Sequence, residues 1–335
     1  MKNRVLFLIV VGILVSTFVW AGGQPQAGAP AAGAAASSWA PSRNVEWIVT
    51  SSPGGGSDIF SRFIADVLAR EGIVSQPIVV SNRTDGVGEA ARLQLSQLRG
   101  PMADHTVMAF NLDDMIHMAQ NTNRRVDAYK ALSIMAVDKH LLYVSKGSRH
   151  QNFPAIINAI RGGSRIVAGG SRGSDTIAMQ LLMLQLNWTE AQMPYVMSLS
   201  SNDAIVSLLG NHIDVVISKP AAASPYVESG DIIPILALSH ERFTGDLAAA
   251  PKLSEVGSFS DLEFPLWRGI IGSPNMSNEA QVFWSNAFKK VTETAAWKDN
   301  YIQRFQLIDI ILDYRQSAEY MANSEKEFLA AFGTN

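Results

Sequence analysis

Short apolar runs alternate with amphipathic stretches along most of the chain. Val45–Thr50 has the composition of a buried strand, and the apolar residues of 59–68 keep the spacing of a helix that Ser57 or Asp58 can cap. The alternation continues with predicted strands at Ile78–Val80 and Thr106–Phe110 and predicted helices at Glu89–Leu98 and Asp113–Thr122. Repeated strand–helix units favour an α/β fold with a parallel, doubly wound sheet and helices on both faces.

A second series of strand–helix units begins after the apolar segment Leu141–Ser145. We expect its strands at Arg165–Ala168, Met193–Val196, Val215–Ser218 and Ile233–Leu238, and its helices at Phe153–Ile160, Asp175–Leu186, Asn202–Leu209 and Ala221–Ser229. The last third is predicted to be helical, at Asn278–Thr294, Ala296–Phe305 and Gln316–Ala331. Two such series predict two α/β lobes with a cleft between them, and ligands in these folds bind beyond the carboxyl ends of the strands.

The first forty residues follow a different pattern. Lys2 and Arg4 precede an apolar segment, Val5–Trp20, and a possible cleavage point follows Ala21, which is typical of a secretory signal peptide. The alternative is an uncleaved membrane anchor, but the apolar run is shorter than the ~20 residues that a spanning helix needs. The uncharged Gly, Ala, Pro and Ser residues that follow cannot form a packed core, so we expect a flexible tether over 22–42.

Composition narrows the classes of function. The 335 residues include 27 Lys plus Arg, 30 Asp plus Glu and no Cys, and the net charge is -3. This balance provides no electrostatic basis for nucleic-acid binding. The absence of cysteine excludes disulfides, thiolate metal sites, a cysteine nucleophile and a lipid-modified cysteine. Together with the leader, these features predict an exported protein that is free in the periplasm.

Pro53–Asp58 joins the first predicted strand to the first predicted helix. Its three glycines allow close approach of a ligand to the backbone, and the helix start behind them offers unpaired N–H groups and a positive dipole end. This combination suits a carboxylate or phosphate. The alternative is a tight turn with a capped helix. A phosphate-binding P-loop is excluded because no Gly-Lys-Ser/Thr follows.

Two further glycine-rich loops admit more than one interpretation. Gly86–Ala91 fits a loose dinucleotide-binding pattern, but it does not follow the first strand, so the indication of a nucleotide is weak. Gly169–Gly173 fits G-x-S-x-G between a strand and a helix, which is the context of a hydrolase nucleophile at Ser171, with Asp214 and His240 following in the right order. The same loop also qualifies as a second anion-binding loop.

The remaining candidate chemistry has simpler explanations. The six histidines have no metal-ligand spacing, so we expect no metal and no cofactor. Asp113 and Asp114 form a paired carboxylate at a predicted helix start, which helix capping explains better than metal binding.

The loops, taken in order, resemble the solute-binding proteins of tripartite tricarboxylate transporters, the Bug family. The segments that carry the resemblance are Ile48–Asp58, Val80–Arg83, Gly169–Asp175, Met193–Tyr195, Asp203–Val215, Leu253–Gly257 and Trp267–Gly269. The resemblance covers nearly all of the chain after Arg43. It departs from the family at Thr50 and Ser51, where Pro and Phe are usual, within 84–88, near 175–176 and at 196–197. The ligand should therefore not be assumed to be citrate.

The resemblance implies a type II-like, two-lobed periplasmic binding protein that closes on a small organic carboxylate. It also implies a membrane permease partner with one large and one small subunit, driven by an ion gradient. We expect a monomer with a signal peptide at 1–21, a tether at 22–42, one lobe formed by 43–143 with 264–335, and a second lobe formed by 144–263. The strands that cross between the lobes are expected near 141–145 and 264–272.

The predicted binding residues lie in the two loops and at nearby strand ends. Residues 54–57 and 170–174 are expected to donate to the ligand carboxylate, while Asp58 caps the first helix and orients its loop. The full predicted set is Ser51, Gly54, Gly55, Gly56, Ser57, Asp58, Asn111, Gly170, Ser171, Gly173, Ser174, Asp175, Ser198 and Ser200. Two alternatives remain open at this point: a secreted serine hydrolase that uses Ser171, and a binding protein that serves as a sensor or adhesive surface component.

Overall fold

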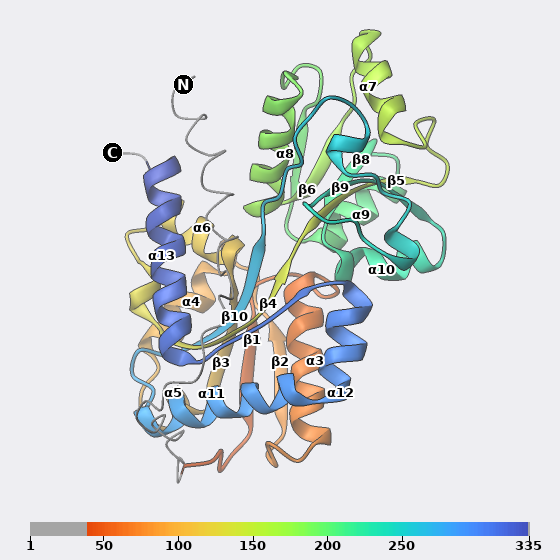
Figure 1. Ribbon diagram of the computed structural model, residues 1–335. Coiled ribbons are helices and arrows are strands. Elements are labelled where there is room, and N and C mark those ends of the chain that lie inside the picture. Colours follow the sequence, from red (N-terminus) through yellow and green to blue (C-terminus); the bar gives the residue numbers. More distant parts are fainter. Residues whose placement is uncertain (1–38, 334–335) are drawn as a thin grey trace, which may run out of the picture.

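The computed structural model describes residues 39–333, which form two α/β lobes (Figure 1). The predicted signal peptide and the tether up to residue 38 lie outside the described residues. Among the helices of 39–333, none has both the length and the apolar character that crossing a bilayer would require.

The first lobe is built on a six-stranded sheet. In spatial order its strands are β11 (Ile308–Leu312), β4 (Lys130–Asp138), β10 (Leu266–Gly272), β3 (Thr106–Asn111), β1 (Val45–Val49) and β2 (Ile78–Asn82). β1 pairs in parallel with β2 and β3, as predicted, whereas β10 is antiparallel to both β3 and β4. The antiparallel pairing has a simple cause. The chain leaves the lobe along β4 and returns along β10, so these adjacent strands run in opposite directions (Figure 1).

The second lobe contains a five-stranded sheet. Its order is β7 (Tyr195–Ser198), β6 (Ala168–Ser171), β8 (Val215–Ser218), β5 (His140–Ser145) and β9 (Ile232–Leu238). β6 is parallel to β7 and β8, while β5 is antiparallel to β8 and β9. The expected two-lobed α/β class is therefore confirmed, with mixed rather than purely parallel sheets.

Helices pack against both sheets. Those of the first lobe are α3 (Gly56–Arg70), α4 (Glu89–Gln97), α5 (Gly100–Asp104), α6 (Leu112–Asn121), α11 (Asn278–Glu293), α12 (Ala295–Trp297), the π-helix η4 (Lys298–Gln303) and α13 (Tyr314–Phe332). Those of the second lobe are α7 (Phe153–Arg161), α8 (Ser174–Gln185), α9 (Ser201–Leu209) and α10 (Pro220–Glu228). Short 3-10 turns are η1 (Val126–Ala128), η2 (Gly245–Leu247) and η3 (Leu253–Glu255). The C-terminal helices α11 and α13 return to the first lobe and pack on β4.

Each sheet of the described structure is buried on both faces. In β1, Trp47 and Val49 belong to one apolar cluster and Ile48 to the cluster on the opposite face, as the alternation of side chains along a strand requires. In β5, Leu142 and Leu141 likewise divide between two clusters. This two-sided burial explains why central strands such as β1 and β5 are continuous apolar runs in the sequence.

The structure differs from the sequence-based expectation in several places. β4 and β11 were not predicted as strands, and the strand expected at Arg165–Ala168 is β6, at Ala168–Ser171. The change of sheet lies at Lys139, between β4 and β5, so the boundary expected after residue 143 falls inside β5. The two charged residues of 131–145, Asp138 and Lys139, lie where the chain passes from one sheet to the other, and the apolar runs on either side of them are β4 and β5.

Candidate functional site

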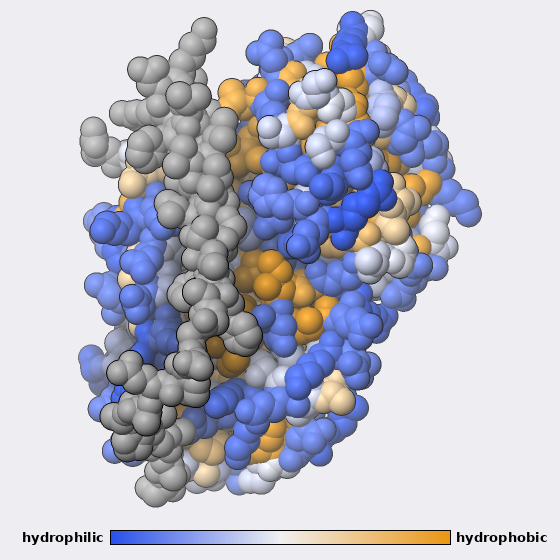
Figure 2. All heavy atoms as spheres, in the orientation of Figure 1, coloured by the Kyte–Doolittle hydropathy of each residue, from blue (hydrophilic) through white to orange (hydrophobic). Residues whose placement is uncertain are grey.

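A cavity of about 70 Å³ lies between the lobes. Residues of both lobes line it: Thr50, Ser51, Gly56, Ser57, Val87, Asn111, Asp113, Asp114, His117, Leu266 and Arg268 from the first, and Ser171, Arg172, Leu199, Ser200, Ser201 and Lys219 from the second. Many of these residues stand at or just after the carboxyl end of a strand, where α/β folds bind ligands. Figure 2 shows a largely hydrophilic outer surface, with hydrophobic residues grouped near the junction of the lobes.

The first glycine-rich loop is held by Asp58. One carboxylate oxygen of Asp58 accepts a hydrogen bond from the Gly54 N–H at 2.9 Å, and the other accepts from Asn82 Nδ2 and Arg62 Nε, each at 2.9 Å. Burial opposes ionisation, but these hydrogen bonds prevail and lower the pKa of Asp58 below its usual value. Asp58 therefore orients the loop as predicted. It is not the helix cap, since the N-cap position of α3 is Gly55.

The second glycine-rich loop is held by an aspartate in the same way. Asp175 accepts a hydrogen bond from the N–H of Ser171 at 2.7 Å, and Ser171 precedes it by four residues, as Gly54 precedes Asp58. The Ser171 hydroxyl also donates to Asp175, at 2.6 Å. The two loops are thus built alike, one in each lobe.

Gly170 belongs to β6 and not to a loop. A Cβ atom at this position would lie 2.5 Å from the Tyr195 hydroxyl and 2.6 Å from Ile217 Cγ2. Close packing against these two side chains accounts for a glycine here.

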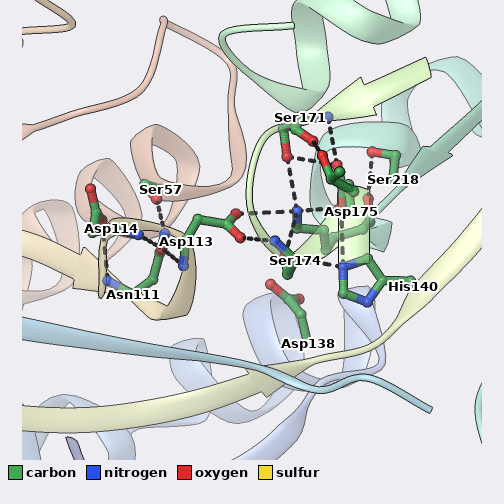
Figure 3. Close-up of polar contacts among 12 residues, drawn as sticks. Ser57, Asn111, Asp113, Asp114, Asp138, His140, Ser171, Ser174, Asp175 and Ser218 are labelled. Atoms are coloured by element: carbon green, nitrogen blue, oxygen red, sulfur yellow. Dashed lines mark hydrogen bonds and ion pairs between the residues drawn. The ribbon is translucent and has the colours of Figure 1, made fainter. Parts of the chain in front are cut away.

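A buried charge cluster lies beneath the second loop (Figure 3). Lys219 Nζ donates to Asp175 Oδ1 at 2.6 Å, and His140 Nε2 lies 3.1 Å from the same oxygen. Burial alone would raise the pKa of Asp175, but the Lys219 ammonium and His140 lower it well below its ordinary value. Burial would likewise lower the pKa of Lys219, yet Asp175 and Asp113 raise it. The pair is therefore an ammonium and a carboxylate at neutral pH.

The lobes touch directly across the cavity. The backbone N–H of Ser174, in the second lobe, donates to Asp113 Oδ1 of the first lobe at 2.5 Å. Asp113 Oδ2 lies 3.6 Å from Lys219 Nζ. Nearby, the Ser52 hydroxyl donates to Asp203 Oδ2 at 3.1 Å. Asp113, which the sequence analysis took as a capping residue, thus makes its contacts across the cleft.

A second buried ion pair joins the crossing strands. Arg268 of β10 is 2% exposed and pairs with Asp138 of β4, which is fully buried. The guanidinium of Arg268 lies so close to Gly56 that a side chain at that position would collide with it. Arg268 Nε has no hydrogen-bond partner among the residues of 39–333, and Arg268 lines the cavity. The cavity therefore contains two buried cations, one from each lobe.

The structure divides the predicted binding residues into two groups. Ser51, Gly56, Ser57, Asn111, Ser171 and Ser200 line the cavity, whereas Gly54, Gly55, Asp58, Gly170, Gly173, Ser174, Asp175 and Ser198 lie in or behind the loops that surround it. Asn111 is also the N-cap of α6 and donates to the Ser57 hydroxyl at 2.8 Å.

Sequence reasoning missed Lys219 and Arg268. Lys219 could have been found, because it is a charged residue that directly follows a buried strand, β8, and precedes a helix.

The hydrolase constellation is not assembled. Asp214 accepts from the Val167 N–H at 2.8 Å, and His240 is exposed. The Ser171 hydroxyl bonds to Asp175, and Lys219 Nζ lies 3.3 Å from it. Among the residues of 39–333, no histidine ring nitrogen hydrogen-bonds to Ser171, as general-base catalysis by histidine would require; His140 Nε2 faces Ser174 and Asp175 instead.

A second serine–histidine pair also fails this test. The Ser174 hydroxyl lies 3.3 Å from His140 Nε2, but the same nitrogen faces Asp175. A triad requires the carboxylate and the serine on different ring nitrogens. No group of acidic and histidine side chains in the described part of the chain is arranged to hold a metal ion.

Two lobes, crossing strands and a polar cavity at the strand ends define a periplasmic-type solute-binding protein. The profile of the tripartite tricarboxylate transporter family receptor, TctC, matches residues 60–327. The chain belongs to this family.

The relatives agree with this assignment. The chain is 24% identical over 270 residues to protein BugT of Bordetella pertussis, covering 76% of this chain and 75% of BugT. MatC of Rhodopseudomonas palustris, solved with bound malate, is similar with a TM-score of 0.73 and 16% identity, covering 88% of this chain and 98% of MatC. The R. palustris protein Rpa4515, solved with adipate, has a TM-score of 0.75 and 17% identity, covering 87% and 96%. At these identities the solved structures establish the fold.

Proposed function

We propose that this protein captures a small organic carboxylate in the interlobe cavity and delivers it to a tripartite tricarboxylate-type membrane permease. The observation that carries the proposal is the donor set around the cavity. Lys219 and Arg268 approach it from opposite lobes, and Ser51, Ser57 and Ser200 add hydroxyl groups at its wall. A carboxylate that meets cations and donors from both lobes favours the closed arrangement over the open one.

Several further features support this function. The family description names a transporter receptor, and two structurally similar proteins were solved with malate and adipate. The predicted partner is a permease with one large and one small membrane subunit. The predicted location is the periplasm, reached by cleavage after Ala21, with no cysteine for a lipid anchor. The binding residues proposed are those of the sequence analysis that line the cavity, together with Lys219 and Arg268.

A ligand panel tests the binding step. Purified protein freed of bound solutes is titrated with mono- and dicarboxylates, including malate and adipate, and with neutral solutes of similar size as controls. Binding raises the melting temperature by mass action, and calorimetry then gives the Kd. A rise with carboxylates alone supports the proposal. A rise with a neutral solute and with no carboxylate contradicts it.

Transport and location need separate tests. Membrane vesicles that contain the permease should accumulate the labelled carboxylate only when this protein is added outside. Uptake that is equal without the protein would contradict a delivery role and leave sensing as the explanation. Mass spectrometry of the protein from a periplasmic extract should show a mature chain that begins at Gly22.

A further inference from the structure

The carboxylate of Asp113, in the first lobe, accepts a hydrogen bond from a backbone N–H of the second lobe. Asp113 lies in the first turn of α6, and its Oδ1 accepts from the N–H of Ser174 at 2.5 Å. Ser174 is the first residue of α8, so its N–H has no partner within the helix and stands at the positive dipole end. Asp113 Oδ2 lies 3.6 Å from the Lys219 ammonium.

The backbone at this point is shaped to admit a carboxylate. Gly173 has φ +77°, and a Cβ atom there would lie 2.6 Å from Asp113 Oδ1. Any side chain at this position would therefore be strained and would also collide with the carboxylate. The Ser174 N–H, the Lys219 ammonium and the space beside Gly173 together form a position that accepts one carboxylate group. We name Ser174 N–H, Lys219 Nζ and Gly173 the second-lobe carboxylate seat.

We propose that Asp113 is an internal stand-in for the ligand: its carboxylate fills the second-lobe carboxylate seat when no solute is bound, holds the lobes together, and is displaced by a carboxylate of the solute. This proposal rests on the proposed function for its biological meaning. The contact between Asp113 and Ser174 itself does not depend on that function.

The geometry of the seat supports displacement. Asp113 Oδ1 already accepts the hydrogen bond from the Ser174 N–H, so a solute carboxylate can take this position only if the Asp113 side chain leaves it or the lobes separate.

Unsatisfied donors in the same cavity indicate where the rest of the solute binds. Arg268 is 2% exposed and its Nε has no hydrogen-bond partner within 39–333. The buried Ser51 hydroxyl oxygen also lacks a partner there. Both residues belong to the first lobe and line the cavity. A solute with two anionic ends can take the seat with one end and meet these donors with the other.

The first test uses no solute. Small-angle X-ray scattering compares the unliganded wild type with Asp113→Ala. The control is Asp127→Ala, which makes the same change at an exposed residue in the first turn of η1, outside the cavity. We expect a larger radius of gyration for Asp113→Ala alone, because the seat is then empty and the lobes are free to separate. An unchanged radius for Asp113→Ala overturns the proposal.

The second test refills the seat chemically. Acetate should restore the compact scattering of Asp113→Ala and raise its melting temperature, at concentrations at least about tenfold below any effect on the wild type. The factor corresponds to loss of the one charged hydrogen bond that acetate must break in the wild type. Acetamide, which is neutral, should do neither. Acetate acting equally on wild type and variant would contradict competition for the seat.

The third test separates this proposal from the proposed function. Malate should bind Asp113→Ala at least about tenfold more tightly than wild type, and Asp113→Asn should lie between them because it keeps an acceptor oxygen without the charge. If removal of Asp113 weakens malate binding, Asp113 contacts the solute directly and the stand-in proposal is wrong, while the proposed function holds. If no carboxylate from the panel binds yet the scattering and acetate results stand, the proposed function fails and the internal carboxylate remains supported.

Discussion

Removal of the Lys219 ammonium should expose how much the second lobe depends on one buried ion pair. Lys219 is 3% exposed, and its Nζ lies 2.6 Å from Asp175, which is fully buried. Lys219→Met preserves most of the side-chain volume but leaves the Asp175 carboxylate without its cation. Breaking a buried pair in this way costs about 3–5 kcal/mol, because one charge remains in a low-dielectric site.

The pH dependence provides a second, independent signature. In the wild type the pKa of Asp175 is lowered, so its contribution to stability is complete above the unfolded pKa of about 3.9 and is lost as the pH falls through the folded value. Without Lys219 the burial that opposes ionisation prevails, and the folded state then binds a proton more readily than the unfolded state. The deficit of the variant should therefore be largest at neutral pH and shrink toward pH 4.

Urea unfolding followed by tryptophan fluorescence measures the free energy of unfolding at several pH values. The control is Lys326→Met, at an exposed position on α13, which should change that free energy by less than about 0.5 kcal/mol. The double variant that adds Asp175→Asn should recover part of the loss, since it removes the unpaired charge. A loss below about 1 kcal/mol for Lys219→Met, or a deficit that does not vary with pH, would refute the reasoning.

Three further predictions concern the loops and the core. Asp58→Asn should lower the free energy of unfolding by about 1–3 kcal/mol at pH 7, since it breaks the charged hydrogen bond to Gly54, and the difference should shrink below pH 3.8 because the wild-type contribution is itself lost there. Gly170→Ala should cost about 1–3 kcal/mol by overpacking, whereas Gly147→Ala, with open space around it, should be nearly neutral in the same urea assay. Phe288→Ala, in the fully buried core, should cost about 3–5 kcal/mol; a loss below 1 kcal/mol would contradict the packing described for that core.

Local patterns predicted most elements but not all of them. β1 and α3 were predictable because a buried strand and an amphipathic helix each leave a periodic record over their own residues. β11, Ile308–Leu312, is a short isoleucine-rich run that the sequence analysis did not interpret as a strand; it is a sheet-edge strand, largely exposed or half-buried, and it pairs with β4. Such pairing joins segments far apart in the chain, and no local window contains it.

The residues of the candidate site also divide into those that local sequence patterns predicted and those that they did not. The glycine-rich loops and Asp58 were predictable because turn chemistry and helix starts are local features. Lys219 and Arg268 were missed because their importance comes from burial and from partners distant in the chain. Their charges alone do not distinguish them from ordinary surface residues.

The sequence by itself determined the two-lobed α/β class, the family and the loops that border the cleft, because each depends on short-range patterns of apolar residues, glycines and helix starts. Only the tertiary structure decided which groups meet inside the cleft. Asp113 is the clearest case, since its position at a helix start indicated a capping role. The approach of the second lobe placed its carboxylate on the N–H of Ser174 instead. Contacts across the cleft depend on how the two lobes come together, and no single stretch of the chain encodes that geometry.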